Sequence, residues 1–154
     1  MRVEVPANTP MVLLRSQGDD QRLLPIYVGT AEASAIHYAL EGLEPPRPLT
    51  HDLLVSLVER LGSEVERVVI VAVRDHTYYA ELHLSGDSGD QVVDCRPSDA
   101  MAIALRTGAT IYVDDDLLDE VGQVPEPAAE EEAEEIIDEF KDFIESVSPD
   151  DFAS

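Results

Sequence analysis

Short runs of alternating or continuous apolar residues predict several β-strands in the first 113 residues. The clearest run is residues 77–84, in which every second residue from Tyr78 to Leu84 falls on one face. Residues 65–73 are rich in β-branched side chains, which is typical of a strand buried on both faces. The predicted strands are residues 1–5, 11–15, 22–28, 65–73, 77–84, 91–95 and 110–113.

Helices are predicted between these strands. Each of the three longer helices has a hydroxyl residue that can cap its start, and a glycine follows its end. They are residues 31–41 after the cap Thr30, 53–61 after the cap Thr50, 98–107 from the cap Ser98, and a short helix at 116–121. Strands occur both as hairpins and on either side of helices. We therefore expect an α+β fold with a mixed, mostly antiparallel sheet and three or four helices.

The C-terminal part of the chain differs sharply in composition from the rest. From Asp114 onwards there are seventeen acidic residues and one basic residue, Lys141, so this part carries a net charge of −16. The first 113 residues contribute only −7. A stretch with two prolines at residues 122–127 is typical of a linker. These shifts predict a domain at residues 1–122, a linker at 123–129 and an acidic helical extension at 130–154.

The predicted extension is amphipathic, because apolar residues recur in it at helical spacing. They are Ile136, Ile137, Phe140, Ile144 and Val147. One interpretation is a helix that docks on its own domain or on a neighbouring subunit. The other is a hook for a protein partner, or an acidic lid that mimics nucleic acid. The sequence leaves both open.

Charge and composition exclude several classes of protein. A net charge of −23 argues against a nucleic-acid binder with a broad basic face and against docking on an anionic membrane. No apolar run approaches the length of a membrane span, and the first residues lack the pattern of a signal peptide. The single cysteine, Cys95, cannot form an internal disulfide. We expect a cytoplasmic protein that does not bind membranes.

One local pattern that can carry chemistry occurs twice: Arg47-Pro48 ahead of Thr50-His51-Asp52, and Arg96-Pro97 ahead of Ser98-Asp99. A helix N-terminus offers free backbone N–H groups, and an adjacent guanidinium can grip a phosphate with two donors. The pattern therefore predicts a phosphate site formed by Arg47, Arg96, Thr50 and Ser98. The sequence does not tell whether the two helix openings meet within one chain or across subunits.

Three carboxylates and one histidine accompany these openings. His51 titrates in a range that suits proton transfer to or from a phosphodiester. Asp52, Asp94 and Asp99 can bind a divalent ion, Mg²⁺ or Mn²⁺, and without a metal the aspartates can orient His51. We therefore expect His51, Asp52 and Asp99 to be catalytic. In the structural alternative, the aspartates only complement helix dipoles and the arginines only stabilise the fold.

The same motifs resemble a known family, the bifunctional nucleases of bacteria and plants. The resemblance spans roughly residues 1–122, and the ending at residues 140–152 is similar to actinobacterial members. It rests on LPIYVG at residues 24–29, EGLEPPRPLTHDL at 41–53 and RPSDAMAIALR at 96–106. The resemblance implies an α+β domain that self-associates and a nuclease that cleaves both DNA and RNA. Positions that match the family pattern are Glu44, Arg47, Thr50, His51, Asp52, Arg96, Ser98 and Asp99.

The sequence therefore predicts a nuclease that hydrolyses phosphodiester bonds of RNA and DNA with little sequence preference. With so few arginines, binding should be weak and salt-sensitive, and a single strand should fit better than a duplex. The alternative is a non-catalytic, oligomeric module that binds a small anion or nucleotide. In it, the acidic C-terminal helix recruits a protein partner. Both hypotheses include a homo-oligomer, a dimer or larger.

Overall fold

A computed structural model describes residues 1–5, 10–124, 137–142 and 145 of the protein. The chain divides into two compact units, Met1–Val124 and Pro125–Ser154. Residues 137–142 of the second unit are helical, with Ile137 and Phe140 exposed. The other apolar residues predicted for the extension, Ile136, Ile144 and Val147, lie outside the described residues. No helix within the described residues is long and apolar enough to cross a membrane.

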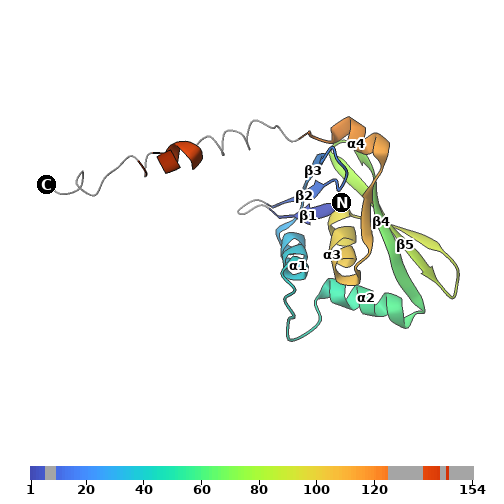
Figure 1. Cartoon of the computed structure of the whole chain (residues 1–154). Helices are drawn as coiled ribbons and strands as arrows, with labels where there is room; N and C mark the ends of the chain where they lie inside the picture. The colour runs from blue at the N-terminus through green and yellow to red at the C-terminus, as the bar shows by residue number, and fades with distance from the viewer. Residues whose placement is uncertain (6–9, 125–136, 143–144, 146–154) are drawn as a thin grey trace. The chain divides into compact units, whose positions relative to one another are not determined.

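The strands of the first unit form two sheets (Figure 1). The first sheet is antiparallel, in the order β1 (Arg2–Glu4), β2 (Met11–Arg15) and β3 (Leu23–Tyr27). The second has the order β6-β5-β4-β7, and its strands are β4 (Ser63–Arg74), β5 (Thr77–Gly86), β6 (Gln91–Cys95) and β7 (Thr110–Val113). Only β4 and β7 are parallel, so the α+β class with mostly antiparallel pairing is confirmed. The sequence predicts one sheet and the structure has two, because alternation identifies strands without identifying their partners.

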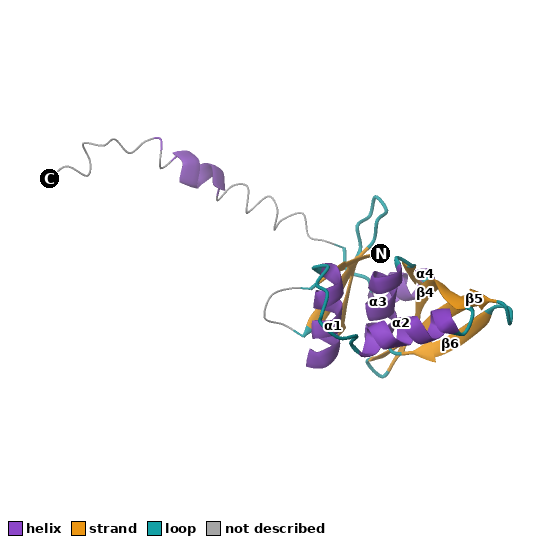
Figure 2. Cartoon of the chain, turned by 90° about the horizontal axis from the view of Figure 1, so that it is seen from below, coloured by secondary structure: helices purple, strands orange, loops and turns teal. Residues whose placement is uncertain are grey.

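The helix α3 (Pro97–Thr107) occupies the centre of the first unit. Its residues 100–104 are all buried. It contacts α1 (Thr30–Leu40) on one side and β4 and β5 on the other, as Figures 1 and 2 show from two directions. The helix α2 (Thr50–Arg60) packs against α3, and α4 (Asp115–Val121) follows β7. The core therefore joins both sheets through α3, with Leu14, Ile36, Ile70 and Met101 among its fully buried side chains.

The predicted helix caps are wrong by one or two residues. The N-caps are Gly29, Leu49 and Arg96, and none of these three helices has a side-chain cap at that position. In α3 the helix starts at Pro97, whose fixed φ and missing N–H suit the first position of a helix. Three hydroxyl residues predicted as caps, Thr30, Thr50 and Ser98, therefore lie inside the first turn instead.

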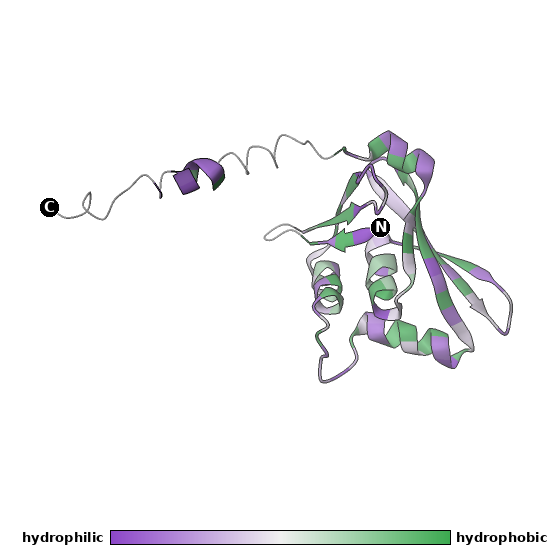
Figure 3. Cartoon of the chain, viewed as in Figure 1, coloured by the Kyte–Doolittle hydropathy of each residue, from purple (hydrophilic) through white to green (hydrophobic). Residues whose placement is uncertain are grey.

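Two surfaces are more open than the sequence predicts. In β4 only Val68 and Ile70 are fully buried, because the α2 and α3 helices cover one face of the sheet while the neighbouring β4 residues remain half-buried. The helix α2 and its C-cap residue carry three leucines in an exposed row, Leu53, Leu57 and Leu61, with exposed fractions of 53%, 47% and 79%. Figure 3 shows this apolar character along α2. We refer to these residues as the leucine row.

Candidate functional site

The first turns of α2 and α3 meet within one chain. His51 and Asp99 are 48 residues apart in sequence, and Nε2 of His51 lies 2.9 Å from Oδ1 of Asp99. The His51 side chain is only 10% exposed. Apart from Ser98, it is the only buried polar residue among those the structure describes. The two helix openings singled out by the sequence are therefore joined by a contact between His51 and Asp99.

Arg96 holds Asp99 from the other side with a two-pronged contact. Its Nε donates to Oδ2 of Asp99 at 2.9 Å and its Nη2 donates to Oδ1 at 3.2 Å. Nη2 also lies 3.1 Å from Oε1 of Glu32 on α1. The Nη1 group makes no hydrogen bond to any described residue, and the Arg96 side chain is 65% exposed. Arg96 therefore keeps two N–H donors available for a ligand.

The charge of Asp99 decides which ring nitrogen of a neutral His51 carries the proton. Burial alone raises the pKa of Asp99, but hydrogen bonds from His51 and Arg96, together with their charge, outweigh burial and hold the pKa below its usual value. Asp99 is therefore ionised at neutral pH, and its oxygens can only accept hydrogen bonds. For a neutral imidazole this assigns the proton to Nε2 and leaves the lone pair on Nδ1.

Nδ1 of His51 is not completely buried. Among the described residues, no fully buried side-chain nitrogen or oxygen lacks a hydrogen-bond partner. Nδ1 has no such partner, so it is not one of the fully buried atoms. A histidine held by a carboxylate at one nitrogen and open at the other has the arrangement of a general base.

This histidine lines a large groove, which we name the His51 groove. It has a volume of about 850 Å³ and lies between α1, α2, α3 and the strands β5 and β6. His51, Arg96, Asp99 and Glu32 line it together with many apolar side chains, such as Leu54, Leu82, Val93 and Ile103. Cys95 also lines the groove, but burial above all raises the pKa of its thiol to about 12. The thiol is therefore protonated at neutral pH and is a poor nucleophile.

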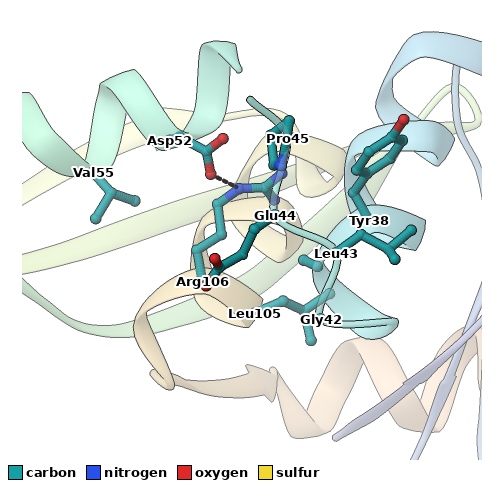
Figure 4. A pocket seen from close by; sticks show the side chains of 10 residues that line it. Tyr38, Gly42, Leu43, Glu44, Pro45, Asp52, Val55, Leu105 and Arg106 are labelled. Carbon is teal, nitrogen blue, oxygen red and sulfur yellow. Dashed lines mark hydrogen bonds and ion pairs between the residues drawn. The ribbon is translucent and has the colours of Figure 1, made fainter. Parts of the chain in front are cut away.

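Asp52 lines a different pocket from its neighbour His51. This pocket has a volume of about 360 Å³ and is drawn in Figure 4. Oδ1 of Asp52 accepts from Nε of Arg106 at 2.8 Å, and Oδ2 accepts from the backbone N–H of Leu49 at 2.8 Å. The hydrogen bond from Leu49, and then that from Arg106, hold the pKa of Asp52 below its usual value. Asp52 is thus ionised, and both of its carboxylate oxygens accept hydrogen bonds.

The other predicted site residues have separate positions. Thr50 lines the His51 groove, whereas Ser98 is buried and lines none of the described pockets that contain His51 or Asp52. Arg47 is exposed, lines neither pocket, and has no hydrogen bond or ion pair with any residue the structure describes. Asp94 is exposed and alternates along β6 with the groove-lining Val93, so it lies on the opposite face of the strand.

The three aspartates expected to bind Mg²⁺ or Mn²⁺ do not fit a shared ion. In the part of the chain that the structure describes, no three His, Cys, Asp or Glu side chains form a group that could hold a metal. Asp52 faces Arg106, and both oxygens of Asp99 accept hydrogen bonds from Arg96. A divalent ion prefers several free carboxylate oxygens, and this arrangement does not provide them. We therefore derive no chemical step through a metal.

Two residues that sequence reasoning missed belong to the site and its support. The side chain of Glu32 is only 19% exposed and pairs with Arg96. Arg106, the last residue of the motif RPSDAMAIALR, contacts the site residue Asp52. Both contacts join residues far apart in the sequence, so no local spacing signals them. A charged residue in the first or last turn of a helix is the only hint available.

Comparison with known proteins gives the same family as the motifs. Residues 12–126 match the sequence model of the bifunctional nuclease domain. An uncharacterized protein of Mycobacterium tuberculosis is 45% identical over 157 residues, which cover 99% of this chain and 93% of that protein. Bifunctional nuclease 2 of Arabidopsis thaliana is 37% identical over 106 residues, and these cover 66% of this chain but 32% of the plant protein. Bifunctional nuclease 1 of Arabidopsis thaliana is 34% identical over 108 residues, covering 68% and 33%.

These matches establish the family to which the protein belongs. The chain belongs to the bifunctional nuclease domain family, because the family match covers most of its length. The chain spans about a third of the plant relatives that carry the nuclease name. Its likeness to the mycobacterial relative extends over nearly the whole of both chains.

Proposed function

We propose that this protein is a nuclease that hydrolyses phosphodiester bonds of RNA and DNA with little sequence preference. One observation carries the proposal. The buried His51 is held by the ionised Asp99 at Nε2, and its Nδ1 is not completely buried, beside the free Nη1 donors of Arg96 in one groove. A general base next to an exposed guanidinium is what hydrolysis of an anionic ester needs. Membership of the family supports the same activity.

In the proposed reaction, Nδ1 of His51 takes a proton from a water molecule as its oxygen attacks phosphorus. Asp99 stabilises the imidazolium that forms, and Arg96 donates to the oxygens on which negative charge develops. The bond from phosphorus to the leaving oxygen then breaks, and the leaving oxygen takes a proton from His51 or from solvent. One proton leaves the attacking water and one reaches the leaving oxygen, so the reaction needs no further reactant.

The same contacts support weak binding of the polyanion. The charge of Arg96 is opposed by Asp99 and Glu32, and the chain as a whole carries −23. Each phosphate contact therefore yields little net attraction, and added salt weakens it further. We propose that the substrate is a single strand, since it needs fewer simultaneous phosphate contacts than a duplex. We also propose a cytoplasmic location.

Cleavage of end-labelled single-stranded RNA and DNA tests this function. Tag-free wild-type protein is compared with His51→Gln and Asp99→Asn, each assayed with Mg²⁺, Mn²⁺ or EDTA. Arg22→Lys is the matched control, because Arg22 also pairs with two carboxylates, Asp20 and Asp119, but lies outside the His51 groove. We expect cleavage in wild type and control, a loss in both site variants, and persistence in EDTA. Equal cleavage by all four proteins would contradict the site.

A second candidate function rests on a different observation, the exposed leucine row of α2. Exposed leucines in a row beside an apolar groove are typical of a surface that binds protein. We propose as the alternative a non-catalytic, oligomeric module that binds a small anion or nucleotide at Arg96. In this alternative the acidic C-terminal helix recruits a protein partner.

Analytical ultracentrifugation of the full chain and of Leu57→Ser separates the alternatives. If α2 forms a subunit contact, the wild type sediments as an oligomer and the variant as a smaller species. An oligomer that survives in Leu57→Ser argues against a contact at the leucine row. Nucleotide binding without cleavage, abolished by Arg96→Ala, would favour the module over the nuclease.

A further inference from the structure

Arg106 joins three helices through one buried guanidinium. Its Nε donates to Oδ1 of Asp52 on α2 at 2.8 Å, and its Nη1 donates to the carbonyl of Ala102 on α3 at 2.8 Å. Its Nη2 donates to the carbonyl of Ala35 on α1 at 3.1 Å. The Arg106 side chain is only 10% exposed. Figure 4 shows the guanidinium against Asp52, with the loop after α1 on its other side.

Asp52 connects Arg106 to the first turn of α2. One of its oxygens binds Arg106, and the other accepts from the N–H of Leu49, the residue just before the helix. His51 is the residue just before Asp52 in the same turn, and its ring reaches in another direction, to Asp99 at the opposite end of α3. The turn that presents His51 is thus attached to α3 at two points, near the two ends of that helix.

These polar contacts matter because α2 buries few of its apolar side chains completely. His51 is the only buried residue of this helix, and the leucine row is exposed. A helix usually takes its orientation from a buried apolar face. In α2 the half-buried Val55 packs against the core, and two ion pairs, Arg106 with Asp52 and His51 with Asp99, add polar contacts at the first turn.

We propose that Arg106 is a positioning residue that, through Asp52, holds the first turn of α2 so that Nε2 of His51 stays on Asp99. This inference rests on the proposed function, in which Nδ1 of His51 is the base. In it Asp52, which the sequence predicts to be catalytic, acts as the link between Arg106 and His51. Neither residue touches the substrate.

Lysine cannot replace arginine in this role. The three acceptors of Arg106 lie on three helices, and the planar guanidinium reaches them in three directions. An ammonium group keeps the charge but places all its donors on one atom. Arg106→Lys therefore separates the loss of geometry from the loss of charge. Asp52→Asn is the second variant, because it keeps the shape of the side chain and removes the charge that Arg106 binds.

The test combines kinetics with nitrogen-15 NMR of the histidine rings in the full-length protein. We expect Arg106→Lys and Asp52→Asn to lower kcat on single-stranded RNA by about 100-fold, because a displacement of the base by about 1 Å has an effect of this size. KM should change little. The ring signals of His51 should move from a single Nε2–H tautomer towards a mixture. Arg22→Lys, the matched control, should leave kcat and the His51 signals unchanged.

A purely structural role predicts a different result. In that case the variants lower Tm, but kcat of the folded protein and the His51 ring signals stay at wild-type values, and the inference is wrong. If the wild type does not cleave RNA, the NMR measurement still decides the positioning of His51, while the proposed nuclease activity fails by itself. If Arg106→Lys does not fold, Asp52→Asn provides the same two readouts.

Discussion

His51 is almost fully buried, yet one of its ring nitrogens is not completely buried. Burial places the imidazole against Asp99, and the ionised carboxylate selects which nitrogen carries the proton. Arg96 keeps that carboxylate ionised and presents its own free donors to the same groove. At the scale of residues, the proposed chemistry therefore depends on one charged cluster, in which Arg96 binds Asp99 and Asp99 binds His51.

The lowered pKa of Asp99 predicts how stability changes with pH. A carboxyl group with a lower pKa in the folded state stabilises the protein above its usual pKa, and this contribution is lost as pH falls through the folded value. At neutral pH we expect Asp99→Asn to reduce the free energy of unfolding by about 1–3 kcal/mol, the usual worth of hydrogen bonds to a charged group.

Urea unfolding at several pH values measures this difference. The gap between wild type and Asp99→Asn should be widest near neutral pH. It should shrink as pH falls below about 4, where the Asp99 carboxyl of the unfolded chain takes up a proton while that of the folded protein is still ionised. A gap that stays constant down to strongly acidic pH would mean that the charge of Asp99 does not stabilise the fold.

At the scale of elements, β5 and β6 form one wall of the His51 groove, and β5 is paired with β4 in a hairpin. Leu82 and Leu84 of β5 line the groove, while β4 carries two irregularities in its pairing with β5. The open end of this hairpin is closed by the pairing of Ser63 with Gly86. Because one strand of the groove wall belongs to this hairpin, the geometry of the wall depends on how closely the two strands approach at that end.

Gly86 permits this close approach. A Cβ atom at position 86 would collide with the carbonyl oxygen of Gly62 and lie 2.8 Å from Cα of Ser63, both of them backbone atoms. We expect Gly86→Ala to lower the free energy of unfolding by about 1–3 kcal/mol, as for other overpacked sites. In the matched control Gly18→Ala, the nearest atoms are 3.4 Å away and φ is not positive, so little change is expected. Thermal unfolding of both variants compares them directly, and equal Tm values would refute the collision.

At the scale of the whole molecule, the distribution of charge is uneven. Residues 125–154 carry twelve acidic residues and one lysine, a net charge of −11, and the first 124 residues carry −12. The compact unit Met1–Val124 includes Gln123, whose backbone pairs with Leu23 of β3. The structural unit therefore extends slightly beyond residue 122, the end of the domain predicted from the sequence.

Removal of residues 125–154 should leave the first unit folded and strengthen its binding to single-stranded nucleic acid. The Tm should stay near the wild-type value because the unit keeps the bridge between Leu23 and Gln123. Affinity should rise at low salt, since the deletion removes a net charge of −11 that repels phosphates, and the gain should vanish at high salt. Fluorescence anisotropy of a labelled oligonucleotide measures both. Equal affinity at low salt would contradict a role of the tail's charge.

Much of this protein follows from local patterns in its sequence. Periodicity identifies the strands and helices because neighbouring side chains take regular directions in each. The repeated Arg-Pro motif places Arg96, His51 and Asp99 in or beside the first turns of two helices, because proline favours such starts. Composition alone separates the mildly acidic domain from the strongly acidic tail.

Only the tertiary structure decides which of these residues meet. His51 and Asp52 are adjacent in sequence, yet one lines the His51 groove with Asp99 and the other faces Arg106, because successive residues of a helix point about 100° apart. Arg47 and Asp94 carry the same chemical groups as Arg96 and Asp99 but have no place in the groove. The sequence determines which groups are available, and long-range packing of α1, α2 and α3 determines which of them share a site, because those contacts span many residues and leave no local periodic signal.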